Sequence, residues 1–157
     1  MKYKGGCVCG AIRYELIEEP LFIQVCHCTH CQTSSGSAFN TTMVSEAYNL
    51  RLLKGEPKAY DTFKGGGGES YDFNVCGDCG VGLWGNVHGQ SNGLVYVRGG
   101  TLDETKELEP AAHIYTKSKQ NWVSIPEGVP QFNEGYDNME DLWPKESIAR
   151  VQALFGS

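Results

Sequence analysis

The sequence predicts a mainly β protein that carries a short C-terminal helix. Short runs of β-branched, aromatic and aliphatic residues alternate with turn residues along most of the chain, and 20 of its 157 residues are glycine. The first 135 residues contain no apolar stretch of helical period long enough to connect two parallel strands. The strands are therefore expected to pair mainly in antiparallel fashion, in one domain of ordinary size.

The strands are predicted from the alternation of apolar and polar residues. Residues 11–17 place Ile12, Tyr14 and Leu16 on one side of an extended chain, as in a half-buried strand. Similar runs separated by turn residues predict further strands at 21–26, 37–44, 50–53, 58–63, 70–75, 83–87, 94–98 and 112–115.

One segment has helical rather than strand periodicity. Residues 144–155 begin at Pro144 and end before Gly156, and their apolar residues Ile148, Val151 and Leu154 recur every three or four positions. We expect a short amphipathic helix that packs on the β domain. The chain is accordingly divided into a β domain at 1–135 and a C-terminal extension at 136–157.

Composition and charge exclude several classes of protein. The net charge of −6 disfavours nucleic-acid binding, because phosphates are bound by clustered Lys and Arg. Neither a secretory leader nor an apolar stretch long enough to span a membrane is recognisable. We therefore expect a cytoplasmic protein that binds neither nucleic acid nor membrane, in a reducing compartment that favours metal binding by thiols over disulfides. The sequence leaves the oligomeric state open.

All seven cysteines fall in three clusters, at 7–9, 26–31 and 76–79. Their spacing within a cluster suits thiolates that share a metal ion better than it suits a disulfide. Cys76 and Cys79, followed by Gly80, have the form of a zinc knuckle. Cys7 and Cys9 are expected to point to the same side of an extended strand. With the knuckle they would complete a structural zinc site of four thiolates.

A compact group of three is formed by the remaining cysteines, Cys26, Cys28 and Cys31. Three protein ligands with one open position are typical of reactive zinc sites, whereas a fourth protein ligand closes a structural site. In one alternative, His27 or His30 closes the site as a set of three cysteines and one histidine. In another, Cys76 joins this group. The open site is favoured, because each histidine adjoins a cysteine ligand and should point away from the ion.

Four segments carry recognisable motifs: 6–14 (GCVCGAIRY), 26–32 (CHCTHCQ), 75–80 (VCGDCG) and 113–122 (HIYTKSKQNW). Together they resemble the glutathione-dependent formaldehyde-activating enzyme family, which includes a centromere protein V branch. All seven cysteine positions match, and the resemblance runs from about residue 3 to Trp122. It implies a β-tent fold of coiled antiparallel sheets. It also implies one zinc bound by the first and last cysteine clusters and a second bound by the middle cluster.

The resemblance implies an activity as well, the joining of glutathione to formaldehyde to give S-hydroxymethylglutathione. We therefore predict a zinc-dependent carbon–sulfur lyase or synthase. Its substrates would be glutathione, or a similar small thiol, and formaldehyde or another aldehyde. The zinc at Cys26, Cys28 and Cys31 would hold the thiolate in its open position. Lys119 and Trp122 are candidates for contacts with glutathione.

Two alternatives also require zinc, with two ions per chain. One is a non-catalytic zinc-binding domain that binds glutathione or a protein partner. The other is a redox sensor in which the central thiolates are oxidised and release their zinc.

Overall fold

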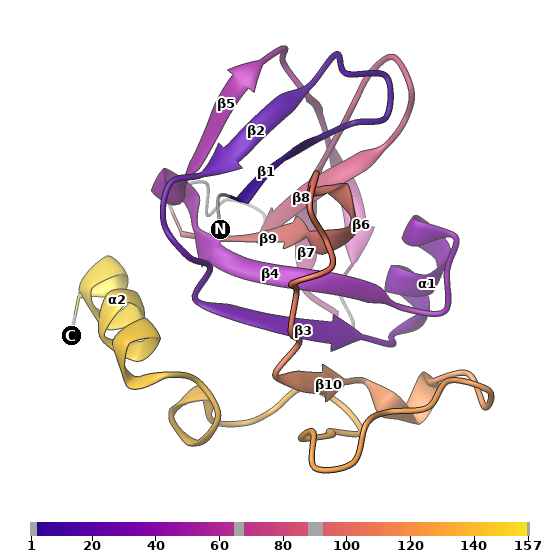
Figure 1. The fold of residues 1–157 in the computed structure, drawn as a ribbon, viewed down its shortest axis with the longest axis vertical. Coiled ribbons are helices and arrows are strands. Elements are labelled where there is room, and N and C mark those ends of the chain that lie inside the picture. The colour runs from indigo at the N-terminus through magenta and orange to yellow at the C-terminus, as the bar shows by residue number, and fades with distance from the viewer. Residues whose placement is uncertain (1–2, 65–67, 88–92, 157) are drawn as a thin grey trace.

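The computed structural model describes residues 3–64, 68–87 and 93–156. Two open sheets form the body of the protein (Figure 1). The smaller sheet has the strand order β1 (Tyr3–Gly6), β2 (Arg13–Leu16), β5 (Leu50–Lys54). The larger sheet has the order β10 (Ala112–Ile114), β3 (Phe22–Cys26), β4 (Asn40–Glu46), β9 (Leu94–Arg98), β8 (Gly82–Val87), β7 (Ser70–Val75), β6 (Lys58–Lys64).

Neighbouring strands are antiparallel, except that β10 runs parallel to β3. Helix α1 (Thr29–Ser35) lies between β3 and β4, and helix α2 (Lys145–Phe155) lies at the C-terminal end of the described chain. Short 3-10 turns occupy Ala47–Asn49, Gly99–Thr101, Thr116–Ser118 and Met139–Asp141. Within the described ranges, no helix is long and apolar enough to cross a membrane.

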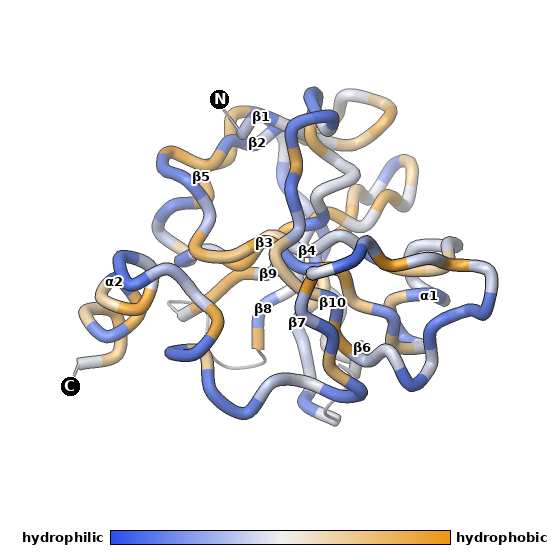
Figure 2. The backbone as a smooth tube through the Cα atoms, turned by 60° about the horizontal axis from the view of Figure 1, so that its bottom comes forward, coloured by the Kyte–Doolittle hydropathy of each residue, from blue (hydrophilic) through white to orange (hydrophobic). Residues whose placement is uncertain are grey.

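The main hydrophobic core lies between the two sheets. Tyr14 and Leu16 on β2 pack with Met43, Trp84 and Val97 from the larger sheet. The rings of Tyr14 and Trp84 meet edge to face, with centroids 5.8 Å apart. Figure 2 shows the corresponding hydrophobic stretches at the centre of the fold, notably along β3 and β9, and hydrophilic stretches in outer loops.

A second cluster covers the opposite face of the larger sheet. Phe22 on β3 and Val44 on β4 face away from the main core and pack against Trp143 and Val151 of the C-terminal segment. The Trp143 ring stacks on Phe22, with centroids 5.1 Å apart. The segment that precedes α2 therefore covers one end of the sheet surface whose other end carries the candidate site described below.

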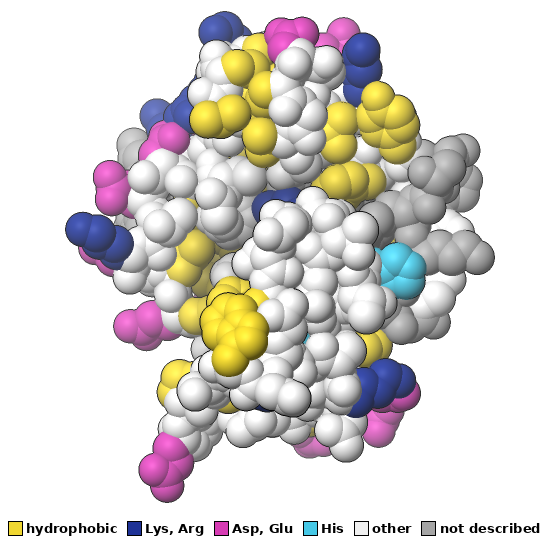
Figure 3. Space-filling view, turned by 90° about the vertical axis from the view of Figure 1, so that its right-hand side faces the viewer, with side chains coloured by type: hydrophobic (Ala, Val, Ile, Leu, Met, Phe, Trp, Pro, Cys, Tyr) yellow, Lys and Arg dark blue, Asp and Glu magenta, His cyan; other side chains and the backbone are white. Residues whose placement is uncertain are grey.

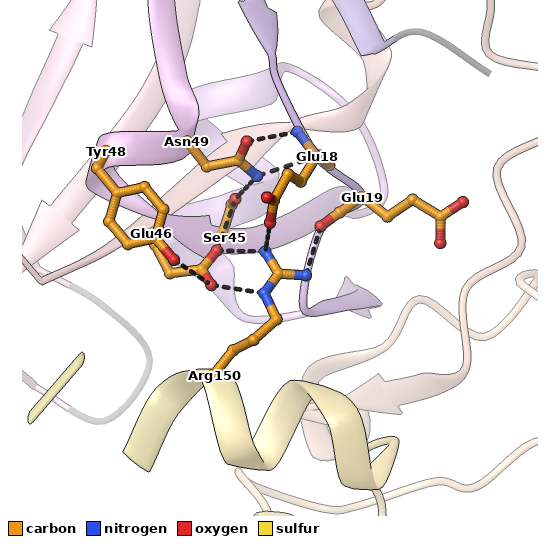
Figure 4. A network of polar contacts seen from close by, with 7 residues as sticks. All are labelled: Glu18, Glu19, Ser45, Glu46, Tyr48, Asn49 and Arg150. Carbon is orange, nitrogen blue, oxygen red and sulfur yellow. Dashed lines mark hydrogen bonds and ion pairs between the residues drawn. The ribbon is translucent and has the colours of Figure 1, made fainter. Parts of the chain in front are cut away.

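An ion pair fixes α2 to the larger sheet (Figure 4). Arg150 donates from Nε and Nη2 to the two carboxylate oxygens of Glu46, at 2.8 and 2.7 Å. The Glu46 side chain is fully buried. Tyr48 Oη donates to the same carboxylate at 3.2 Å, and Arg150 Nη1 donates to the Glu19 carbonyl at 3.0 Å. Helix α2 is therefore held by a buried carboxylate as well as by apolar contacts.

The predicted class is confirmed: the protein is mainly β, its sheets are open and largely antiparallel as the β-tent resemblance implies, and a short helix lies near the C-terminus. Strands β7 and β9 have the predicted bounds. Strand β1 was not predicted. The strand expected at 37–44 begins only at Asn40, because residues 37–38 form a bend after α1 and the N–H of Ser37 donates to the Gln32 carbonyl of that helix. Helix α1 was also missed, because none of its residues is buried and it lacks an apolar stripe.

Candidate functional site

Four thiols from distant parts of the chain meet at one place. Cys7 and Cys9 follow β1, and Cys76 and Cys79 lie in the turn between β7 and β8. The four sulfur atoms lie within 4.8 Å of one another. Cys9 Sγ is 3.4 Å from Cys7 Sγ and 3.7 Å from Cys76 Sγ. Because β1 belongs to the smaller sheet and β7 and β8 to the larger, this four-thiol cluster joins the two sheets.

Two similar tight turns build the four-thiol cluster. The N–H of Gly10 donates to the Cys7 carbonyl at 3.0 Å, and the N–H of Gly80 donates to the Cys76 carbonyl at 2.9 Å. Gly10 and Gly80 have φ angles of +71° and +75°, which glycine adopts without steric cost. The N–H of Ile12 donates to Cys7 Sγ at 3.2 Å. The expected extended strand at 7–9 is therefore wrong, because a turn brings these two sulfurs together.

The three-thiol cluster is formed by Cys26, Cys28 and Cys31, whose sulfurs also lie within 4.8 Å of one another. Cys26 ends β3, Cys28 is the N-cap of α1, and Cys31 lies in the first turn of this helix. Cys28 Sγ accepts the N–H of Cys31 at 3.3 Å, in place of the oxygen that usually caps a helix. Helix α1 ends at Ser35 and is capped by Gly36, which has a φ of +62°. The helix thus depends on the thiol cluster and a glycine cap, not on a buried face.

Protons are shared unevenly within the three-thiol cluster. Hydrogen bonds from the Cys26 and Cys31 thiols, and then from backbone N–H groups, hold the pKa of Cys28 well below that of a free thiol. The pKa of Cys26 is raised, because its thiol donates to Cys28 and Cys31 and is also buried. These hydrogen bonds favour the thiolate form of Cys28, which is the form that binds metal ions.

The two neighbouring histidines do not join the three sulfurs in the described structure. His27 is fully buried, and its Nε2 lies 2.8 Å from Nδ1 of His113 in a hydrogen bond. His30 is exposed on α1. The described residues therefore place three sulfurs and no imidazole at this cluster, as the interpretation of an open three-cysteine site requires.

A pocket of about 230 Å³ opens beside the three-thiol cluster. Its floor is one face of the larger sheet, to which strands β3, β4, β9, β8 and β7 contribute alternate residues. The floor residues other than cysteine are Gln24, Asn40, Thr42, Tyr71, Phe73, Gly85, Tyr96 and Arg98. Ile114, Tyr115 and Tyr136 complete the walls. Gly85 lies between Tyr96 and Phe73 in the strand register and carries no side chain, so it leaves space above the sheet.

Two buried polar residues of the pocket were not predicted. Arg98 and Gln24 are only 8% and 6% exposed. Arg98 also lines a second hollow of about 350 Å³ next to Cys79. Figure 3 shows the face of the protein that carries α1, most of which is covered by backbone and by side chains that are neither charged nor hydrophobic. The sequence signal that could have found Arg98 is the alternation along the strand at 94–98, which places Arg98 on the same face of the sheet as Tyr96.

Tyr115 has an unusual backbone conformation for a residue other than glycine. It has a φ of +56°, in the left-handed region, which is strained for an aromatic residue. Its pKa is raised to about 12 by burial and then by the negative charge of Glu69. The Tyr115 hydroxyl is therefore neutral at physiological pH and can donate a hydrogen bond inside the pocket.

Lys119 and Trp122, the candidates for glutathione contacts, do not line this pocket. Lys119 Nζ donates to the carbonyls of Val123 and Gln120, at 2.6 and 3.2 Å. Trp122 is 73% exposed, and its indole N–H donates to Gln120 Oε1 at 2.7 Å. Their contact with glutathione stays a prediction.

The fold and the site define a class of protein: a mainly β domain with one cluster of four thiols and one of three, both suited to a soft metal ion. The family described as glutathione-dependent formaldehyde-activating enzyme matches residues 2–118, and the chain belongs to this family. Among curated proteins, none matches the sequence. A Rhodobacter sphaeroides protein of known crystal structure is 20% identical, covering 68% of this chain and 91% of that one, with a TM-score of 0.47.

Proposed function

We propose that the protein binds two zinc ions and makes or breaks a carbon–sulfur bond in the adduct of a small thiol with formaldehyde or another aldehyde. Cys7, Cys9, Cys76 and Cys79 would hold a structural zinc. Four thiolates at a Zn–S distance of about 2.3 Å stand about 3.8 Å apart in a tetrahedron. The sulfur separations of 3.4 and 3.7 Å in this cluster are close to that value.

The observation that carries the proposal is the position of the three-thiol cluster at the wall of the pocket. Cys26, Cys28 and Cys31 supply three ligands, one fewer than a closed structural zinc site has. The pocket offers space for a ligand at the fourth position. When bound there, zinc would supply an acceptor for an external sulfur and would lower the pKa of that thiol.

The reaction itself needs no oxidant or reductant. In the direction of addition, the thiol sulfur forms a bond to the carbonyl carbon, the carbon–oxygen π bond becomes a lone pair on oxygen, and the thiol proton finally resides on that oxygen. In the direction of cleavage the same steps run backwards. Tyr115, neutral in the pocket wall, would donate a hydrogen bond to the oxygen as its negative charge develops.

Zinc content tests the division of the cysteines. We expect two zinc ions per chain in the wild type and one in Cys28→Ser, which should keep its fold because Cys26–Cys31 is a local cluster. Cys9→Ser removes a ligand of the four-thiol cluster and should weaken the fold itself. Two ions retained in Cys28→Ser would contradict the assignment. The measurement is metal analysis of purified protein, with circular dichroism as the control for folding.

Turnover tests the reaction. The rate of S-hydroxymethylglutathione formation from glutathione and formaldehyde, followed by NMR exchange, should exceed the uncatalysed rate with the wild type and fall to it with Cys28→Ser. Equal rates with and without wild-type protein would reject the enzymatic role for this substrate pair. Thiol binding to the wild type without turnover would then support a non-catalytic binding domain.

A redox sensor is the remaining candidate, and the lowered pKa of Cys28 favours it, because thiolates are the form that peroxide oxidises. It requires that mild peroxide releases one zinc and that a reductant restores binding. All seven cysteines are free thiols in the described structure. A reducing setting, which we take to be the cytoplasm, would keep them so.

A further inference from the structure

The pocket contains a buried cation that no acidic residue of the described structure neutralises. Arg98 is 8% exposed. Two of the five N–H groups of its guanidinium donate to Ser34, at 3.2 Å to the carbonyl and 2.6 Å to Oγ. Within the described ranges, no Asp or Glu forms an ion pair with Arg98 and no further acceptor is found. Its described contacts, the Ser34 oxygens and the Phe73 ring, are uncharged. A buried charge without an ion-pair partner is costly, so the arrangement points to an anion that is supplied from outside.

A second buried group nearby also has no partner. Gln24 is 6% exposed, and its Oε1 has no hydrogen-bond partner among the described residues. Gln24, Thr42 and Arg98 are directly opposite one another on β3, β4 and β9 and point to the same face. Two strand spacings place the Cα atoms of Gln24 and Arg98 about 10 Å apart. Both residues line the pocket, so one small ligand can reach both.

We propose that Arg98 and Gln24 recognise the non-reacting end of the thiol, and that the pocket selects thiols that carry a carboxylate and an N–H donor. Arg98 binds the carboxylate, and Gln24 accepts the N–H. This inference rests on the proposed function, because the ligand's sulfur is held at the three-thiol cluster. Cys26 follows Gln24 by two residues on the same strand face, about 7 Å along the strand. Sulfur, carboxylate and N–H thus have separate positions within one small pocket.

The charges at the two ends of the pocket give the ligand a direction. On the wall formed by β7, the Arg98 guanidinium carbon lies 4.7 Å from the ring centroid of Phe73. Glu69 lines the pocket just before the start of the same strand, beyond Tyr71. A carboxylate is attracted at the Arg98 end and repelled at the Glu69 end. A thiol without a carboxylate would be neither attracted at one end nor repelled at the other.

The competing explanation is that Arg98 only balances the negative charge of the three thiolates. Burial lowers the pKa of Arg98, and the charge of Cys31 acts in the opposite direction. Under this explanation, loss of the guanidinium would weaken the binding of zinc and would weaken the binding of all thiols equally. Under the proposal, loss of the guanidinium removes the preference for a carboxylate and leaves a neutral thiol nearly unaffected.

A pair of matched probes separates these explanations. N-acetyl-L-cysteine and N-acetyl-L-cysteinamide share the thiol and the acetamide N–H and differ only in the carboxylate. By isothermal titration calorimetry with the zinc-loaded full chain, the wild type should bind the acid at least tenfold more tightly than the amide. Arg98→Met should abolish this ratio and change the dissociation constant of the amide by less than twofold. Gln24→Met should weaken both probes by the same factor.

Each other result contradicts a specific statement. Equal binding of both probes to the wild type, or an equal loss of both in Arg98→Met, overturns the role of Arg98, while the proposed function stands. Binding of neither probe to the wild type rejects the proposed thiol site and this inference with it. If Arg98→Met loses its fold or its zinc, the test uses Arg98→Lys instead. This variant should still bind the acid more tightly than the amide, but by a smaller factor than the wild type. Lys117→Met is the control, because Lys117 is an exposed cation outside the pocket, paired with Glu134.

Discussion

The ion pair between α2 and β4 gives a prediction whose size follows from burial. The Glu46 side chain is fully buried, whereas that of Arg150 is 21% exposed. In Arg150→Met, the carboxylate loses two charge-assisted hydrogen bonds of 2.8 and 2.7 Å and keeps the bond from Tyr48 at 3.2 Å. The methionine retains much of the apolar stem. The main effect is therefore a buried carboxylate without its cation.

The expected loss of unfolding free energy is about 3 kcal/mol, at the lower end for a broken buried pair because Arg150 is partly exposed and Tyr48 remains. For a chain of this length, 1 kcal/mol corresponds to a shift of about 2–4 °C in Tm, so the variant should melt about 6–12 °C lower. Hydrogen exchange in peptides from 145–155 should increase as well, since α2 loses its main polar contact.

The assay is thermal unfolding followed by circular dichroism at pH 7 and fixed zinc concentration. Lys117→Met is the matched control, because the side chains of Lys117 and Glu134 are 57% and 68% exposed and such a pair contributes at most about 1 kcal/mol. Glu46→Gln in the Arg150→Met background should restore part of the stability, because it removes the unpaired charge. If Arg150→Met has the same Tm as Lys117→Met, the expected loss of stability is refuted. If Glu46→Gln does not restore stability in the Arg150→Met background, the unpaired carboxylate is not the cause of the loss.

Two further predictions concern the sheets and the pocket. Gly5→Ala should cost about 1–3 kcal/mol, because the new Cβ would lie 2.4 Å from the Thr101 carbonyl oxygen and 2.7 Å from Tyr14 Oη. Thermal unfolding checks this against Gly100→Ala, where nothing lies within 4 Å of the new atom, and equal Tm values for the two variants would contradict it. Tyr115→Phe should lower kcat on the order of 100-fold and leave KM for the thiol within about twofold, because only the hydroxyl group that donates the hydrogen bond is removed. NMR exchange with two zinc ions confirmed per chain measures this, and an unchanged kcat would exclude the phenol from the reaction.

The sequence was informative where the chemistry is local. Cysteine spacing predicted the three-thiol cluster and the two pairs at 7–9 and 76–79, and alternation predicted most strands, because each signal lies within a few neighbouring residues. The joining of the two pairs into one cluster was favoured by the cysteine count and implied by the family resemblance, not specified by spacing. Helix α1 was missed because it is nucleated by the Cys28 sulfur and carries no apolar stripe. The pairs between Glu46 and Arg150 and between His27 and His113 join residues far apart in the sequence, so no local pattern reports them.

The polar residues of the pocket could not be predicted from the sequence either. Gln24 and Arg98 become neighbours only through the register of β3, β4 and β9, which the sequence does not specify. The sequence points instead to Lys119, a cation within the motif at 113–122. The structure gives its ammonium two carbonyl partners and leaves the Arg98 guanidinium with donors to spare. A buried polar group that lacks a hydrogen-bond or ion-pair partner is a stronger indication of a binding site than a charge within a motif, and only coordinates reveal it.

The two thiol clusters differ in how far the stability of the fold depends on them. Cys9 and Cys76 are 67 positions apart and lie on strands or turns of different sheets, so a metal ion shared by them closes a long loop and holds the sheets together. The three-thiol cluster spans only the end of β3 and the first turn of α1. Its closure restrains few residues, and the sheets do not depend on it. If this cluster holds a zinc ion as proposed, a ligand could enter, or a thiolate could leave the ion, at little cost to stability, as a reactive site would require.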